Sequence, residues 1–280
     1  MTQSFNIVRA LAETASATPH ANAIVNGKES LSYRELATRG EALRVRLMPV
    51  LKSRRVGILG SRSFEAYIAI AGIAAAGAAY VPLNMKWPEA RLVSLLQQLE
   101  LDALIVDGQG EKLLSDAVLN AAPSLVLRPA ELVEEAEAGL TPVARDAAET
   151  AYIVFTSGTT GEPKGVVVSC GALAEYLANT RGWAGFGPSD RVAEAHDITF
   201  DLSVHNVFLA WEAGSAIHLM NALDMMAPQR FIRAAEITCW MSVPTIIAQM
   251  QRIGALKPGL FDTLRLSVFC GEPLPLAAVT

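Results

Sequence analysis

The chain has 280 residues, of which 51% are hydrophobic and 18% are charged, so it has enough apolar material for a large core and does not resemble a disordered chain. Its 23 basic and 28 acidic residues give a net charge of −5, which argues against nucleic acid or an anionic membrane as a partner. The three cysteines have no metal-ligand spacing, which argues against a disulfide framework or a zinc site. We therefore expect a cytoplasmic protein.

Helical and strand-like segments alternate along the chain, which is typical of an α/β fold with layered helices and mostly parallel sheets. The acidic, Ala-rich stretch 130–148 is predicted to form a short helix and a connector. Ser169 is a predicted N-cap for a helix that continues through Tyr176. The clearest predictions are strands at 56–59, 79–83 and 103–106 and helices at 63–75 and 89–99.

Residues 66–85 are uncharged and long enough to be considered as a membrane span. They consist largely of Ala and Gly, which gain little from lipid, and Gly72, Gly77 and Pro82 interrupt them. A buried helix that runs into a strand explains the segment better. Residues 1–12 lack the basic start and apolar run of a secretory signal.

Ten residues from Thr156 to Gly165, with the sequence TSGTTGEPKG, have the composition of a phosphate-binding loop. The glycines let the backbone approach a ligand closely, and the hydroxyls and the lysine can bind phosphate oxygens. The loop lies between the apolar run 151–155 and the β-branched run 166–168, so we expect a turn between two buried strands. The candidate phosphate ligands are Thr156, Ser157, Gly158, Thr159, Thr160, Gly161 and Lys164.

The pattern of the P-loop NTPases is absent, because Lys164 follows Pro163 and precedes Gly165. Composition alone also allows a Gly/Thr/Ser-rich surface loop without a ligand. The position of Lys164 beside the turn, together with the flanking strands, favours a phosphate site. ATP is the ligand that we expect there.

Five blocks, in order along the chain, resemble the adenylate-forming (AMP-binding) superfamily. Besides the loop, they are LSYREL at 31–36, AGAAYVPL at 76–83, FDLS at 200–203 and FCGEPLP at 269–275. The superfamily includes acyl-CoA synthetases, peptide-synthetase adenylation domains and stand-alone amino-acid:carrier-protein ligases. The later blocks are most similar to those of stand-alone ligases such as the D-alanine:carrier-protein ligases.

The resemblance implies ATP-dependent activation of a small amino acid as an aminoacyl-adenylate, followed by transfer to the phosphopantetheine thiol of a carrier protein. Residues 156–165 would bind the β- and γ-phosphates of Mg-ATP, with Lys164 as the counter-charge. Gly271, Glu272 and Pro273 would line the adenine site, mostly through their backbone.

Asp201, in the FDLS block, has two interpretations. It can cap the apolar helix-like run that follows it, since Asp is a favoured N-cap. In amino-acid-activating members of the superfamily, the aspartate at this position pairs with the α-ammonium group of the substrate. Such a charge-assisted contact contributes about 1.5–3 kcal/mol.

The resemblance places five more residues in the side-chain pocket of the substrate: Leu202, His205, Met241, Val268 and Cys270. If a helix begins near Asp201, His205 lies on the same face, four residues further on. Taken alone, each of these residues is also typical of a protein core. The histidine departs from the apolar residue expected at its position, which leaves a small polar or cyclic amino acid as an alternative to D-alanine.

The superfamily continues beyond the last residue of this chain, to a segment that contacts adenine, phosphate and magnesium, a ribose-binding aspartate and a mobile C-terminal lid domain with the catalytic lysine. No residue here is therefore assigned as catalytic or as a metal ligand, and Lys257 does not correspond to that lysine. We expect residues 1–280 to be the N-terminal part of an adenylation domain without its lid. Such a chain would be defective alone or would depend on a separately encoded C-terminal half.

Two alternatives remain open. One is activation of a simple carboxylate in the manner of an acyl-CoA synthetase, which has no ammonium group to bind. The other is a non-catalytic remnant that keeps its affinity for ATP or for a substrate, because the sequence contains every site residue that this part of the domain can supply and none of the later ones.

Overall fold

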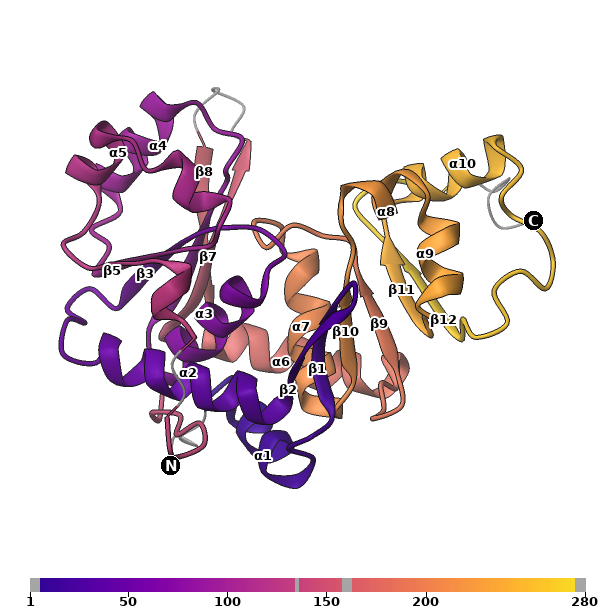
Figure 1. Ribbon diagram of the computed structural model, residues 1–280, viewed down its shortest axis with the longest axis horizontal. Coiled ribbons are helices and arrows are strands. Elements are labelled where there is room, and N and C mark those ends of the chain that lie inside the picture. The colour runs from indigo at the N-terminus through magenta and orange to yellow at the C-terminus, as the bar shows by residue number, and fades with distance from the viewer. Residues whose placement is uncertain (1–5, 134–135, 158–162, 275–280) are drawn as a thin grey trace.

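The computed structural model describes residues 6–133, 136–157 and 163–274, and these form two six-stranded sheets with helices between and outside them (Figure 1). The first sheet has the strand order β6 (Val126–Leu127), β5 (Ala103–Val106), β3 (Arg55–Leu59), β4 (Ala79–Leu83), β7 (Thr150–Ser157) and β8 (Pro163–Ser169). The second has the order β12 (Leu266–Phe269), β11 (Cys239–Ser242), β9 (Arg191–Glu194), β10 (Ala216–Leu219), β1 (Asn22–Asn26) and β2 (Glu29–Ser32).

Helices form three layers around these sheets. The middle layer contains α1 (Arg9–Ala17), α2 (Tyr33–Leu47), α3 (Phe64–Ala75), α6 (Cys170–Ala184) and α7 (Leu202–Ala213). The outer face of the first sheet carries α4 (Glu89–Gln98) and α5 (Asp116–Ala121), and that of the second carries α8 (Ala222–Met226), α9 (Pro228–Ala234) and α10 (Pro244–Arg252). Two short 3-10 turns are η1 (Gly110–Leu113) and η2 (Pro129–Glu131). The largest apolar core lies in the middle layer.

Both sheets are mostly parallel, as the alternating pattern predicts. Among the described strands, the antiparallel pairs are β1 with β2 and β7 with β8. The carboxyl ends of parallel strands meet at one edge of a sheet, where ligands of open α/β folds bind. Most candidate site residues lie at or just beyond the carboxyl ends of β7, β9, β11 and β12.

The individual strand and helix predictions are confirmed in β3, β4 and β5 and in α3 and α4, with small shifts at the ends. Residues 66–75 belong to α3, in which every side chain from Ala66 to Ala75 is buried, and the chain then enters β4. Across the described parts of the chain, no helix is long and apolar enough to cross a membrane. Ser169 caps α6 as predicted, because its side chain accepts a hydrogen bond from the Ala172 N–H.

The acidic stretch near residue 130 agrees with the predicted short helix and connector. In its described part, the helix is limited to the 3-10 turn η2, and the following chain runs along the end of α3. There the Val143 N–H donates to the Ala75 carbonyl at 2.8 Å, and the buried Arg145 donates to the carbonyls of Ala78 and Thr150. These contacts with another element replace the intrahelical hydrogen bonds that a longer helix would need.

The β-branched run 166–168 lies in β8, but this strand is not buried as predicted. Val166 is 43% exposed and Val167 is 61% exposed, because β8 is the edge strand of the first sheet. Its partner β7 does contribute to the core, through Ala151, Tyr152, Ile153 and Val154. The prediction of two buried strands is therefore correct for β7 and wrong for β8.

Two glycines allow α2 and α3 to pack closely in the middle layer. A Cβ atom added at Gly72 would lie 2.8 Å from the Gly40 carbonyl oxygen and 2.9 Å from the Leu43 Cβ. Neither neighbour can move easily, because one is backbone and the other is the first carbon of a buried side chain. The contact between the helices therefore requires glycine at position 72.

We expect Gly72→Ala to lower the free energy of unfolding by about 1–3 kcal/mol, because overpacking separates the two helices. Gly182→Ala is the matched control, since Gly182 lies in α6 with no atom within 4 Å of the added Cβ. That change should stabilise the chain by about 0.5–1 kcal/mol through helix propensity. Urea unfolding followed by circular dichroism measures the stability of both variants. If Gly72→Ala is as stable as the parent chain, this packing is contradicted.

Candidate functional site

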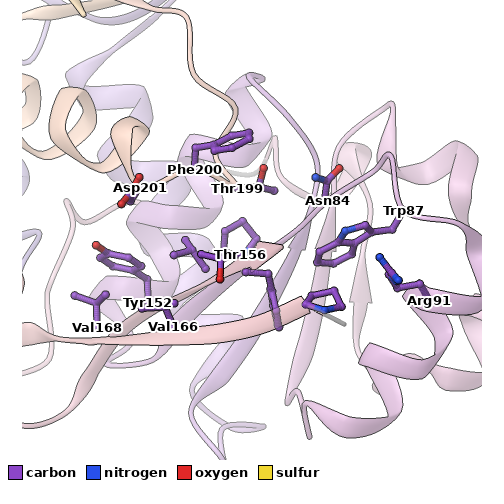
Figure 2. Close-up of a pocket in the computed structure, with 14 residues that line it drawn as sticks. Asn84, Trp87, Arg91, Tyr152, Thr156, Val166, Val168, Thr199, Phe200 and Asp201 are labelled. Atoms are coloured by element: carbon purple, nitrogen blue, oxygen red, sulfur yellow. The ribbon is translucent and has the colours of Figure 1, made fainter. Parts of the chain in front are cut away.

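Two neighbouring cavities open where the loop before α7 meets the β7–β8 hairpin. The larger one has a volume of about 510 Å³ and the smaller one about 250 Å³. Tyr152, Val168 and Asp201 line both and so form their common wall. In Figure 2 the Tyr152 ring extends toward Asp201, while Trp87 and Arg91 lie on the opposite side of the larger cavity.

The predicted phosphate loop forms the hairpin that borders the larger cavity. Thr156 lines this cavity and pairs with Lys164 across the antiparallel strands, near the turn end of the hairpin. Ser157 pairs with Pro163 in the same way. Gly158, Thr159, Thr160 and Gly161 lie outside the described residues. The structure thus brings Thr156 and Lys164 together beside a cavity, and their contact with phosphate stays a prediction.

Asp201 occupies the N-cap position of α7, but its side chain makes no capping hydrogen bond. Its backbone is in the right-handed helical region, with φ −61°, instead of the extended conformation of most capping residues. Asp201 therefore stands where a capping residue would stand, but its carboxylate does not act as a cap. That carboxylate is exposed and lies at the junction of the two cavities.

The Asp201 carboxylate interacts electrostatically with three weakly acidic groups. Burial raises the pKa of Tyr152 to about 12, and the negative charge of Asp201 adds to this effect. Burial and the same charge also raise the pKa of the Cys270 thiol and the Tyr176 phenol. At neutral pH these three groups stay protonated and uncharged, so none of them competes with Asp201 for a cation.

The predicted pocket residues lie in three different parts of the structure. Leu202 lines the smaller cavity beside Asp201, as predicted for a substrate pocket. His205 lies behind that cavity, only 2% exposed, with its Nδ1 atom 2.8 Å from the Tyr176 hydroxyl. Its side chain is enclosed between α6 and α7, so direct contact with a substrate is not shown.

The other pocket residues lie on neighbouring strands of the second sheet. Met241 in β11 is paired with Val268 in β12, and the Cys270 N–H donates to the Ser242 carbonyl at 3.3 Å. Cys270 is not among the residues that line either cavity, and its side chain is half-buried. Met241 is nearly buried and Val268 is half-buried, so the core interpretation of these two residues remains open.

The predicted adenine residues follow β12. Gly271 has φ +86°, a conformation that favours glycine, and it turns the chain at the end of the strand. The Glu272 carboxylate accepts hydrogen bonds from the N–H and the hydroxyl of Thr245, in the first turn of α10. The Glu272 side chain thus links the turn after β12 to the start of α10. Adenine binding by Gly271, Glu272 and Pro273 stays a prediction.

Several cavity residues were missed by the sequence analysis. Asn84, Trp87 and Arg91 follow β4, and their position after the carboxyl end of a predicted strand was the available signal. Tyr176 carried no such signal, because it lies inside a helix and reaches the smaller cavity only through the packing of α6 on α7. Among the described residues, no group of His, Cys, Asp and Glu side chains could hold a metal ion.

Comparison with known proteins identifies the family of the chain. Residues 11–280 match the family of AMP-binding enzymes. The chain belongs to this family. It is 32% identical over 277 residues to an L-proline--[L-prolyl-carrier protein] ligase of Streptomyces coelicolor, with 89% of this chain and 51% of the ligase covered.

Solved structures of family members share the fold. The crystal structure of IdnL7 matches with a TM-score of 0.85 and 32% identity, covering 98% of this chain and 57% of that one. The Vibrio cholerae adenylation domain AlmE, solved with glycyl-adenosine-5′-phosphate, matches with a TM-score of 0.82 and 28% identity, covering 95% and 54%. This AMP-binding family member thus spans about half the length of these relatives.

An ion pair between Asp190 and Arg265 holds the start of β12, the strand that directly precedes Cys270. The Asp190 carboxylate accepts hydrogen bonds from Arg265 and, at 2.6 Å, from the Thr238 hydroxyl. Burial acts to raise the pKa of Asp190, but the hydrogen bonds from Arg265, Thr238 and the Gly187 N–H outweigh it and lower this pKa to about 2.

Because the folded-state pKa of Asp190 lies below the ordinary value of about 3.9, the ionised group stabilises the fold above that pH. We expect Asp190→Asn to lower the free energy of unfolding at pH 7 by about 2 kcal/mol. The difference from the parent chain should shrink as the pH falls from about 4 toward 2, as measured by urea unfolding at several pH values. A difference that does not change with pH would contradict this linkage.

Proposed function

We propose that this chain contributes the N-terminal part of an enzyme that adenylates a small amino acid and passes it to the phosphopantetheine thiol of a carrier protein. The observation that supports this proposal most is the placement of Asp201. An aspartate whose side chain does not cap its helix lies where a cavity beside the phosphate-loop hairpin meets a second, smaller cavity. One side offers room for a phosphate group and the other for a side chain.

In this arrangement, the α-ammonium group of the amino acid pairs with Asp201, and the side chain of the amino acid enters the smaller cavity. Its carboxylate is then directed to the larger cavity, toward Thr156 and Lys164. Attack of that carboxylate on the α-phosphorus of ATP releases pyrophosphate and forms the aminoacyl-adenylate. Positioning of the two reactants and stabilisation of phosphate charge are the main demands of such a step.

ATP with Mg²⁺ is the proposed nucleotide substrate. The hydroxyl of Thr156 and the ammonium of Lys164 are chemically suited to bind its phosphates. Magnesium would supply further charge neutralisation on those phosphates, and its protein ligands are proposed to lie outside residues 1–280. The proposal also places the C-terminal lid domain of the enzyme outside residues 1–280, and it places the protein in the cytoplasm.

ATP–pyrophosphate exchange by the purified chain tests the proposal most directly. We expect exchange that depends on a small amino acid when the missing half of the domain is supplied as a second polypeptide, and little exchange without it. Exchange that depends equally on acetate would favour an acyl-CoA synthetase-like reaction. A folded pair of polypeptides that binds neither ATP nor any amino acid would contradict the proposal.

We expect Asp201→Ala to weaken binding of an amino acid about 10- to 100-fold, because a charge-assisted contact of about 1.5–3 kcal/mol is lost. Isothermal titration calorimetry with small amino acids measures this effect. Asp116→Ala is the matched control, since Asp116 lies in the first turn of α5, on the outer face of the first sheet. Equal affinities in the parent chain and in Asp201→Ala would remove the ammonium role.

We expect Lys164→Ala to weaken binding of Mg-ATP by about tenfold or more, because the cation near the turn end of the hairpin is lost. Lys257→Ala provides a control with the same charge change outside the hairpin. Fluorescent ATP-analogue titration reports the affinities, and an increase in ionic strength should reduce the difference between the parent and Lys164→Ala. If both lysine variants bind alike, Lys164 is not a phosphate ligand.

A further inference from the structure

The Tyr176 hydroxyl is fixed from behind by a buried histidine. The His205 Nδ1 atom lies 2.8 Å from this hydroxyl, and the imidazole is only 2% exposed. The rings of Trp183 and Phe186 pack on the imidazole, with centroid distances of 5.8 and 6.0 Å. A side chain so enclosed has a single orientation, so it holds the phenol of Tyr176 in place.

The other side of Tyr176 faces the smaller cavity. Tyr176 lines this cavity together with Asp201, and the charge of Asp201 contributes to the raised pKa of the phenol. Cys270 is close enough to contribute to the same shift. The phenol and the carboxylate therefore border one small space, from α6 and from the start of α7.

The hydrogen-bond capacity of this pair is not exhausted. Burial lowers the pKa of His205 to about 4, with a further effect of His196, so the imidazole is neutral at pH 7 and has one N–H. A phenol has one donor and also accepts, and one of these positions is used with Nδ1. For either tautomer of the histidine, Tyr176 keeps a donor or an acceptor position for a group in the cavity.

The size of the cavity limits what can fill it. Its volume is about 250 Å³, and apolar walls formed by Val168, Leu173 and Leu202 surround the polar groups. A small side chain that carries a hydroxyl fits this combination, since a hydroxyl can both donate and accept. The α-carbon of an amino acid whose ammonium group pairs with Asp201 would lie within reach of the same space.

The geometry points to Tyr176 as a specificity-determining residue that selects a small amino acid with a side-chain hydroxyl, and to His205 as the residue that positions Tyr176. This inference rests on the proposed function, since it assumes that Asp201 binds the ammonium group. It changes the role predicted for His205 from substrate contact to support of a neighbouring contact. A site built to hydrogen-bond a hydroxyl disfavours the analogue that lacks it, because a polar group is then left unpaired.

Stable aminoacyl-adenylate mimics, the aminoacyl sulfamoyladenosines, test this inference by calorimetry on the full chain. We expect the seryl compound to bind about tenfold more tightly than the alanyl compound, and the phenylalanyl compound to bind most weakly. In Tyr176→Phe, the ratio of seryl to alanyl affinity should fall to about one. Glu175→Gln, an exposed neighbour on the same helix, is the matched control and should keep the parent ratio.

Two histidine variants separate positioning from general packing. An asparagine can present its amide near the position of Nδ1, so His205→Asn should keep most of the preference for the seryl compound. His205→Leu should lose this preference, although circular dichroism should show that the variant is still folded. One result would overturn the inference while the proposed function stands. In that result the mimics bind, Asp201→Ala weakens their binding, and the parent chain binds the seryl and alanyl compounds equally well. If no mimic binds to the folded chain even when the rest of the domain is supplied as a second polypeptide, both are overturned.

Discussion

The close packing of α2 on α3 is the constraint on which the rest of the structure depends. Helix α3 lies between the two sheets and is buried along almost its whole length, so its small side chains determine how near the sheets can approach. At Gly72 there is room only for a hydrogen atom against the Gly40 carbonyl. A larger residue would move α2, which packs on β1 and β2, relative to the sheet that carries the hairpin.

The candidate site depends on that relative position because its parts come from both sheets. The hairpin with Thr156 and Lys164 belongs to the first sheet, while Asp201 follows β9 of the second. Helix α6 packs on β7 and β8, and α7 packs on β9 and β10, so their mutual contact joins the two halves of the site. The hydrogen bond between Tyr176 and His205 spans this contact.

The electrostatics of the site follow from the same packing. Burial keeps Tyr152, Tyr176 and Cys270 protonated and His205 neutral, and the Asp201 carboxylate adds to the effect on the first three. The result is one anion among neutral polar groups at the junction of two cavities. None of these neutral groups competes with Asp201 for a cation on the ligand, which is why we assign the ammonium group of an amino acid to Asp201.

Local periodicity and capping chemistry were sufficient to predict the strands β3 to β5, the helices α3 and α4 and the cap at Ser169. The family could also be predicted, from short blocks whose order does not depend on coordinates. Three features required the folded structure: β8 is an exposed edge, residues 140–145 run along α3, and His205 lies behind Tyr176. Those features arise from contacts between segments distant in the chain, and a local pattern contains no information about which neighbour a side chain will meet.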